Sequence, residues 1–555
     1  MTPLQIRSLL FLLPILLAAW PMRDGLFSGE MVGAGPDVTT TLWTMWWYQK
    51  EWTDAAWGGI SHYFNYPLGG RGAILSPLTA TTWALLDPML GPNRAGALTS
   101  WSQIALFGGA VAWLAREIGL SKAGAIAALL ACFCQRYLFF GTGETSIVGI
   151  SALPIPIGLI ALLRLQKGAP QSRWLILATL CMGLQPLENP YLTPVLPGVA
   201  LLMLIRPIGR KRLAWALLSG IAAIVLVGLI HKSATTLAYE STKPTDYVGW
   251  GNVLWPVVER PWAAAQFQWF FWPPATVWSE GADQTVNAQG REYLGLSVLF
   301  LSAIAVWKFP KKSLPWLGFG LIGVVLSMGS SLGGFPGPFA LLNAVCLRLV
   351  RALTQPTRYL VLSHIGLALT AAWGFEAVRR HSYKAGWIAG GVLAIDAFLV
   401  GGLSLQLPTM RVPTPSCVEA LEQQEGAVLI WPWDGADRHD PEAPTKSRML
   451  QVAHSRPGAT IGTGSWPLVG RVFPGETLRA NAWIEGFKGG NGYIELQELS
   501  NKGFQWIVAD MGAPDRLLGD PDALFGNGQA PYDACPGYRV YKMPPPLMRI
   551  DGAPH

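Results

Sequence analysis

Charged residues are scarce in this chain: they make up 14% of its 555 residues, whereas hydrophobic residues make up 51%. A typical soluble domain carries about 25% charged residues, because water must solvate its surface. The mean hydropathy of +0.32 points in the same direction. The composition therefore argues against a soluble protein of this size and indicates an integral membrane protein.

Motifs of soluble enzymes are also missing. The chain contains no H-E-x-x-H and no G-x-G-x-x-G after a strand-like run. The segment Gly141–Ser146, GTGETS, resembles a phosphate-binding loop but lacks the terminal G-K-[ST], so no lysine can reach a phosphate there. We therefore expect no bound cofactor.

The net charge of +7 does not predict a nucleic-acid partner. A nucleic-acid binder gathers Lys and Arg on one face or in one tail, whereas here they lie in short segments between apolar runs. This distribution follows the positive-inside rule, which sets membrane topology. We expect contact with membrane lipid and no nucleic acid.

Apolar runs of spanning length recur along the first 404 residues. The first, Leu9–Trp20, follows Arg7 and has no small-residue cleavage site after it, which predicts an uncleaved anchor with a cytoplasmic N-terminus. The segment Leu75–Leu90 is interrupted by Pro77, Asp87 and Pro88, and we expect it to be re-entrant or interfacial. Ten further spans are predicted at 97–115, 123–140, 146–164, 174–188, 190–205, 213–231, 293–307, 314–330, 358–378 and 385–403.

The short connections between alternate spans are basic, which fixes the predicted orientation. With the N-terminus inside, every cytoplasmic connection carries Lys or Arg, and counting Leu75–Leu90 as a span would put all of these clusters outside. The predicted fold is a polytopic α-helical membrane protein, with about 11 transmembrane helices and an extracytoplasmic C-terminus. The basic connections are 116–122, 164–173, 206–212, 308–312 and 379–384.

Two domains are predicted, a membrane domain at 1–404 and an extracytoplasmic α/β domain at 405–555. The first has two large outer loops, at 23–96 and 232–291, and the aromatic stretch Thr41–Trp52 in the first loop resembles a helix lying in the membrane interface. Polar residues, Pro and Gly characterise the second domain, together with the short β-type runs Ala427–Trp433, Phe504–Asp510 and Tyr538–Met543. Cys417 and Cys535 bracket it, so a disulfide is expected in an oxidising compartment, with two buried thiols as the alternative.

Asp37 is the foremost catalytic candidate. It follows the Gly-rich turn Gly33–Pro36 and precedes the aromatic stretch, which would hold it at the rim of the membrane. A carboxylate there can act as a general base toward a hydroxyl or amine acceptor. The alternative is a purely structural N-cap, because Asp before a helical run is also a good helix start.

Other charged residues lie at the outer ends of predicted spans. An ionisable group at membrane depth is costly unless it faces a cavity or a partner, so Glu144 and Glu188 are candidates to line a polar pocket. Glu188 lies in the break Pro186–Pro190, and an exposed tight turn is its alternative. Arg358 is placed to pair with a lipid phosphate, or else to anchor its helix at the headgroup level.

The order of several motifs resembles the GT-C class of membrane glycosyltransferases, and most closely its large, mostly uncharacterised bacterial branch. Each motif is weak by itself, but together they cover most of the chain. The matching segments are Gly35–Trp47, Tyr63–Gly70, Leu85–Leu98, Gly141–Arg164, Glu292–Leu301, Leu353–Val378 and Gly426–Trp433.

This resemblance implies the transfer of a sugar from a polyprenyl-phosphate donor to a glycan, lipid or protein acceptor at the outer face of the bacterial inner membrane. It implies that Asp37 is the catalytic carboxylate and that basic residues such as Arg71 and Arg358 lie near the donor phosphate. The chain departs from the class in having no second acidic residue beside Asp37, which argues against a bound divalent metal. Two other functions stay open, a transporter or flippase of a lipid-linked substrate and a non-catalytic envelope assembly protein.

Overall fold

In the computed structural model of the protein, the chain forms two units. The helical unit consists of Met1–Val38, Leu75–Gly228 and Thr245–Met410, and the sheet unit consists of Thr39–Ile74, Leu229–Pro244 and Arg411–His555. The described residues are 12–33, 36–51, 63, 76–144, 152–168, 171–189, 192–205, 208–240, 270–271, 292–328, 331–332, 335–336, 356–431, 450–456, 497, 500–501, 503–511 and 531–545.

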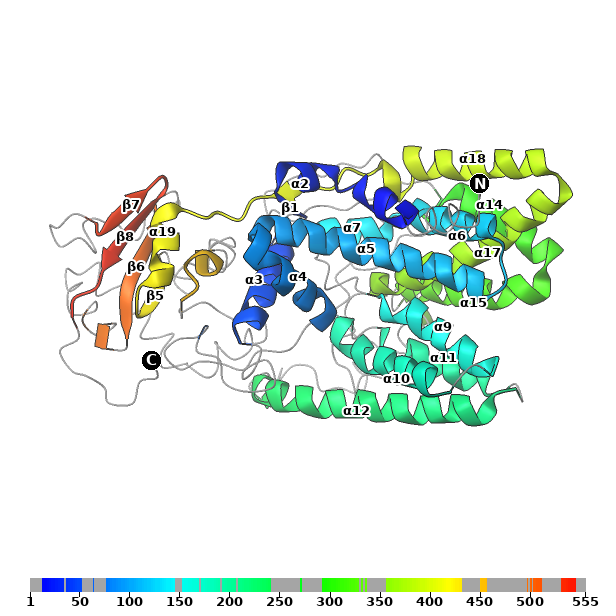
Figure 1. The fold of residues 1–555 in the computed structure, drawn as a ribbon, viewed down its shortest axis with the longest axis horizontal. Helices are drawn as coiled ribbons and strands as arrows, with labels where there is room; N and C mark the ends of the chain where they lie inside the picture. The colour runs from blue at the N-terminus through cyan, green and yellow to red at the C-terminus, as the bar shows by residue number, and fades with distance from the viewer. Residues whose placement is uncertain are drawn as a thin grey trace. The chain divides into compact units, whose positions relative to one another are not determined.

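Helices make up most of the helical unit (Figure 1). Two short strand pairs accompany them, β1 (Met31–Val32) with β4 (Thr409–Met410) and β2 (Ser331–Leu332) with β3 (Phe335–Pro336). Helices α3 (Pro36–Lys50) and α12 (Arg210–Glu240) begin in this unit and end in residues of the sheet unit. The other helices are α2 (Arg23–Ser28), α4 (Pro77–Leu90), α5 (Pro92–Glu117), α6 (Lys122–Cys134), α7 (Tyr137–Glu144), α9 (Pro154–Gln166), α10 (Gln171–Glu188), α11 (Val195–Met203), α14 (Leu296–Lys308), α15 (Pro310–Ser327), η5 (Pro356–Tyr359), α17 (Leu360–His381), α18 (Tyr383–Leu399) and η6 (Gly402–Ser404).

Each of the ten predicted spans from residue 97 onward contains a helix. Pro92–Glu117 and Thr357–His381 are long and apolar enough to cross a bilayer by themselves. The predicted span 123–140 is divided, because Gln135 leaves the helical conformation after α6 with ψ 138° and α7 begins at Tyr137. The predicted non-spanning segment contains α4, a helix of 14 residues with Pro88 inside it.

Large apolar side chains cover the outside of several helices. On α12, Trp215, Leu218 and Leu226 are each 59–60% exposed, and on α18 Ile388 and Leu399 are 68% and 73% exposed. A soluble monomer rarely exposes a continuous apolar surface of this kind, because water contact with it is costly. The described part of the helical unit therefore belongs in a membrane, where these side chains contact lipid.

Helix α17 forms the centre of the helical unit, and all but its last residues are buried. Glycines allow neighbouring backbones to reach it. A Cβ on Gly366 would overlap the backbone of Gly320 in α15 and lie 2.5 Å from the carbonyl oxygen of Trp316. A Cβ on Gly374 would overlap the carbonyl of Leu301 in α14. Helices in membranes gain packing energy from such close approaches at small residues.

The sheet unit contains a four-stranded mixed sheet of order β5-β6-β8-β7. Strand β5 (Ala427–Trp431) pairs with β6 (Phe504–Asp510) in parallel, and β8 (Tyr538–Lys542) pairs antiparallel with both β6 and β7 (Asp533–Cys535). The three β-type runs in the sequence each become a strand. Two short helices, α19 (Ser416–Glu419) and η7 (Ala420–Gln423), precede β5.

A disulfide joins Cys417 in α19 to Cys535 in β7, with 5.7 Å between their Cα atoms. The bond closes a loop across a sequence separation of 118 residues and ties the start of the sheet unit to its last hairpin. Cys417 packs in the apolar core of the sheet with Val418, Ile430 and Val508. The predicted pairing of Cys417 with Cys535 is therefore present, and the alternative of two buried thiols is wrong.

The aromatic residues of α3 lie inside protein. Trp43, Trp46 and Trp47 are 1–2% exposed, and the indole N–H of Trp43 donates to Oε1 of Gln451 at 2.8 Å. The rings of Trp43 and Trp47 are stacked at 6.5 Å. The expectation that this stretch lies in the membrane interface is therefore wrong for these side chains, which form core contacts of the sheet unit.

The glycine contacts of α17 can be tested with two matched substitutions. Gly366→Ala places a methyl group against the backbone of α15, so we expect a loss of about 1–3 kcal/mol of stability and a lower melting temperature of the detergent-solubilised protein. Gly318→Ala in α15 is the control, because nothing lies within 4 Å of its Cβ position. Equal melting temperatures for the two variants would contradict the tight α15–α17 contact.

Candidate functional site

The start of α3, which carries Asp37, is held by the strand pair ahead of it. Met31 pairs with Met410 and Val32 with Thr409, and the N–H of Gly33 donates to the carbonyl of Pro408 at 2.7 Å. Gly33 has φ +104°, a backbone conformation that favours glycine. Helix α3 then begins at Pro36, and proline suits the first turn because the N–H it lacks would have no helical partner there.

Asp37 is the second residue of α3, one position inside the helix. It therefore lies in the first turn, where the helix dipole stabilises a negative charge. Its backbone position is described, and its side chain lies outside the described residues.

The same turn touches the end of α7, which carries Glu144. A Cβ on Gly33 would lie 3.0 Å from the carbonyl oxygen of Thr142, so the two backbones are in direct contact. Thr142 is buried, its hydroxyl donates to the carbonyl of Leu138, and Glu144 is the last residue of α7. The fold thus brings together the segments that carry two acidic candidates. The side chain of Glu144, like that of Asp37, lies outside the described residues.

Two other acidic residues of the first outer loop have structural roles. Oε2 of Glu30 accepts a hydrogen bond from the hydroxyl of Thr409 at 2.7 Å, and Oδ2 of Asp24 accepts one from Nε2 of Gln406. Both contacts fasten the segment ahead of α3 to the chain that follows α18. They reinforce the strand pair that positions Asp37.

Glu188 caps another helix. Its Oε1 accepts the backbone N–H of Leu78 in the first turn of α4 at 2.6 Å, and its carbonyl accepts the hydroxyl of Ser76 at 3.1 Å. Glu188 and Ser76 are fully buried. A carboxylate at a helix N-terminus is stabilised by the free N–H groups and by the helix dipole. The alternative of an exposed turn is therefore wrong, and the described contacts of Glu188 give it a structural role.

The two basic candidates are placed differently. Arg358 lies half-buried in η5, directly before the first turn of α17. This is the end of α17 opposite to Arg379 and Arg380. Arg71 lies outside the described residues.

A polar network at the N-terminal end of α14 escaped the sequence analysis. Oδ1 of Asp396 accepts from the hydroxyl of Tyr293 at 2.6 Å, and Oδ2 accepts from the N–H and hydroxyl of Ser297 at 2.8 and 2.6 Å. Arg136 is 5% exposed and donates from Nε to the carbonyl of Val400 at 2.6 Å. Its guanidinium lies 5.7 Å from the centre of the Tyr293 ring. Ionisable residues inside predicted spans, Arg136 and Asp396, were the available signal.

Carboxylates hold the basic helix ends together at the other end of the unit. Oε2 of Glu117, at the end of α5, accepts from Arg164 at 2.6 Å, and Oε1 accepts from Lys167 at 3.0 Å. Oε1 of Glu376, in the last part of α17, accepts the N–H and hydroxyl of Ser121, and its Oε2 accepts from Arg379 at 3.0 Å. The ends of α5, α9 and α17 and the start of α6 therefore meet in one basic region.

Metal binding has no support in the described part of the chain. No group of three or more His, Cys, Asp or Glu side chains there is arranged to hold an ion. Cys132, Cys134 and Cys181 are buried in α6 and α10, where thiols pack as small apolar groups.

No family model and no curated protein matches the chain. Several solved structures are similar to it, each at low sequence identity and with a TM-score below 0.5. The arabinofuranosyltransferase AftD from mycobacteria has a TM-score of 0.48 and 14% identity, over 98% of this chain and 42% of that one, so this chain spans less than half of its length. The Archaeoglobus fulgidus oligosaccharyltransferase has a TM-score of 0.47 and 11% identity, over 90% of this chain and 69% of that one. ArnT from Cupriavidus metallidurans, bound to undecaprenyl phosphate, has a TM-score of 0.41 and 13% identity, over 96% and 97% of the two chains.

The capping role of Glu188 predicts a difference between two substitutions. Glu188→Leu leaves the buried N–H of Leu78 without its carboxylate acceptor, and we expect a loss of about 1–3 kcal/mol of stability. Glu188→Gln keeps a carbonyl oxygen for this bond and should lose less. Melting temperatures of both variants in the same detergent test the prediction, and a Leu variant as stable as the Gln variant would contradict it.

Proposed function

We propose that the protein is a membrane glycosyltransferase that moves a sugar from a polyprenyl-phosphate donor to an acceptor at the outer face of the bacterial inner membrane. The contact between Gly33 and the carbonyl of Thr142 carries the proposal. It places the helix start with Asp37 beside the helix end with Glu144. The sequence lacks a second carboxylate beside Asp37, and in this proposal Glu144 provides it from another segment. The order of the sequence motifs is the second support.

In the proposed reaction, Asp37 is the general base. The acceptor hydroxyl or amine attacks the anomeric carbon of the sugar and gives its proton to the carboxylate. The bond from the anomeric carbon to the donor phosphate breaks at the same time, so that polyprenyl phosphate leaves and the anomeric centre is inverted. Such a base typically contributes about 10²–10⁴-fold to the rate.

The other candidate residues have roles in binding. Glu144 orients the acceptor, or stabilises the positive charge that develops on the attacking acceptor atom near Asp37. Arg71 and Arg358 bind the donor phosphate, because guanidinium groups pair with phosphate through paired hydrogen bonds. The reaction as proposed uses no metal or cofactor.

The proposed topology has about 11 spanning helices, a cytoplasmic N-terminus and a C-terminal domain outside the cytoplasm. The basic helix ends support it, since Arg164, Lys167 and Arg379 come together with the termini of α5 and α6. The positive-inside rule places such a region in the cytoplasm. The Cys417–Cys535 disulfide is a second support, because such bonds persist in oxidising compartments.

The disulfide gives a test of this topology. In intact cells a thiol reagent should leave Cys417 and Cys535 unlabelled until a reductant is added, and the protein should change its mobility on a non-reducing gel. Replacing both residues by Ser should lower the stability of the sheet unit by about 3–5 kcal/mol, because the bond closes a long loop. Free thiols at both positions in cells would contradict the extracytoplasmic placement.

Asp37→Asn should reduce sugar transfer about 100-fold or more, because the amide cannot accept the acceptor proton. The measurement is release of undecaprenyl phosphate from radiolabelled undecaprenyl-phosphate sugars by membranes that contain the full chain. Asp24→Asn is the matched control, since it changes a carboxylate of the same loop and keeps an acceptor for Gln406. It should retain full activity.

Two outcomes would change the assignment. Full transfer by Asp37→Asn would remove Asp37 from the reaction. Movement of the intact labelled lipid between leaflets, without release of undecaprenyl phosphate, would favour a flippase.

A further inference from the structure

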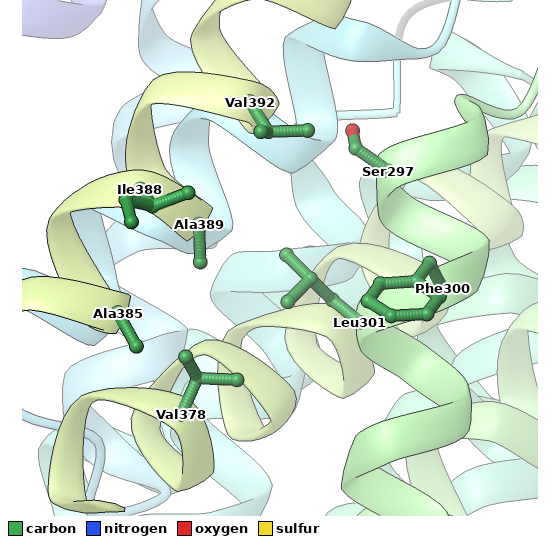
Figure 2. A pocket seen from close by; sticks show the side chains of 8 residues that line it. All are labelled: Ser297, Phe300, Leu301, Val378, Ala385, Ile388, Ala389 and Val392. Atoms are coloured by element: carbon green, nitrogen blue, oxygen red, sulfur yellow. The ribbon is translucent and has the colours of Figure 1, made fainter. Parts of the chain in front are cut away.

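An apolar groove runs between α14 and α18 (Figure 2). It has a volume of about 270 Å³. Its side chains include Phe300 and Leu301 from α14 and Ala385, Ile388 and Ala389 from α18. Phe300 and Ile388 are each 68% exposed at its edges. The groove therefore opens on the lipid-facing surface of the helical unit.

The groove follows one half of α18. It extends from Ala385, the third residue of the helix, to Val392 near its middle. Seven residues of α-helix correspond to about 10 Å, which is less than half the thickness of the hydrocarbon core. The groove thus lies within one leaflet and can hold part of a single acyl chain.

A satisfied polar network closes one end of this groove. Ser297 is the polar residue of the lining, and its hydroxyl donates to Asp396 at 2.6 Å. Tyr293 and the backbone N–H of Ser297 complete the partners of that carboxylate. A charged headgroup would find no free hydrogen-bonding group among these described contacts at this end.

The other end of the groove is basic. Val378 in its lining is followed by Arg379 and Arg380, Lys384 precedes Ala385, and Lys308 ends α14. The described acidic residue among them, Glu376, is buried and bound to Ser121 and Arg379. Trp307 and Trp387 are 76% and 69% exposed beside these cations. Exposed Trp with Lys or Arg is the pattern of a helix end at the headgroup level.

The groove is apolar and has one basic end. We therefore propose that the groove binds one acyl chain of an anionic phospholipid, whose phosphate lies near Lys384 and Lys308. The lipid belongs to the leaflet at the basic end of the helices. The sugar donor of the proposed function has its headgroup at the opposite face, so this lipid site is separate from the transferase site and does not depend on it.

The test uses the full chain, purified in detergent and stripped of lipid. It is then titrated with phosphatidylglycerol, with phosphatidylcholine of the same acyl chains, and with undecaprenyl phosphate, and binding is measured by native mass spectrometry. Ala389→Trp fills the groove, and Ile395→Trp is its control on the exposed surface of α18 outside the lining. Lys384→Gln and Lys308→Gln test the phosphate contact, with Lys211→Gln in α12 as the control. Gel filtration of each variant checks that it is folded.

We expect phosphatidylglycerol to bind more tightly than phosphatidylcholine, and Ala389→Trp to lose this binding while Ile395→Trp keeps it. Each lysine variant should bind phosphatidylglycerol about fivefold more weakly, since one cation near a membrane surface contributes about 1 kcal/mol. Lys211→Gln should bind normally. The proposal is overturned by equal binding of the two phospholipids, by full binding to folded Ala389→Trp, or by undecaprenyl phosphate as the sole occupant.

Discussion

The close packing of α17 against α14 and α15 is the constraint on which the helical unit depends. Gly366 and Gly374 leave no room for a Cβ, so the neighbouring helices contact the backbone of α17 directly. Lipid supplies no hydrophobic force to bring helices together, and close van der Waals contact takes its place. Because α17 is rigidly seated, both of its ends are fixed: η5 with Arg358 at one, and Glu376 with the basic region at the other.

The two ends of the helical unit differ in how their charges are paired. At the N-terminal end of α14, Asp396 is enclosed by Tyr293 and Ser297, so the charge is satisfied locally. At the basic end, Glu117 and Glu376 are buried while their Arg and Lys partners stay partly exposed. A buried carboxylate with an exposed cation leaves positive charge at the surface, where lipid phosphates lie. This asymmetry accounts for the orientation that the basic loops predict.

Hydropathy predicted the helical segments well, because burial in lipid imposes a length and a composition on each span. It failed for Trp43, Trp46 and Trp47, since an apolar ring has the same signature in a membrane interface and in a protein core. Strands β5, β6 and β8 of the sheet unit followed their local patterns. Neither the contact of Gly33 with Thr142 nor the cap formed by Glu188 has a local pattern, because each joins segments that are distant in the sequence.

Helix ends are where such a protein can assemble a polar site, since the hydrocarbon-facing middle of each helix must keep its backbone groups bonded internally. Asp37 is the second residue of α3 and Glu144 is the last residue of α7, so the position of each depends on the contacts that hold its helix end. The start of α3 is held by the β1–β4 pair and by Gly33, whose positive φ turns the chain toward α7. A side chain at Gly33 would press against the carbonyl oxygen of Thr142 and separate the two ends. The geometry of the candidate site therefore depends on a residue that carries no chemistry of its own.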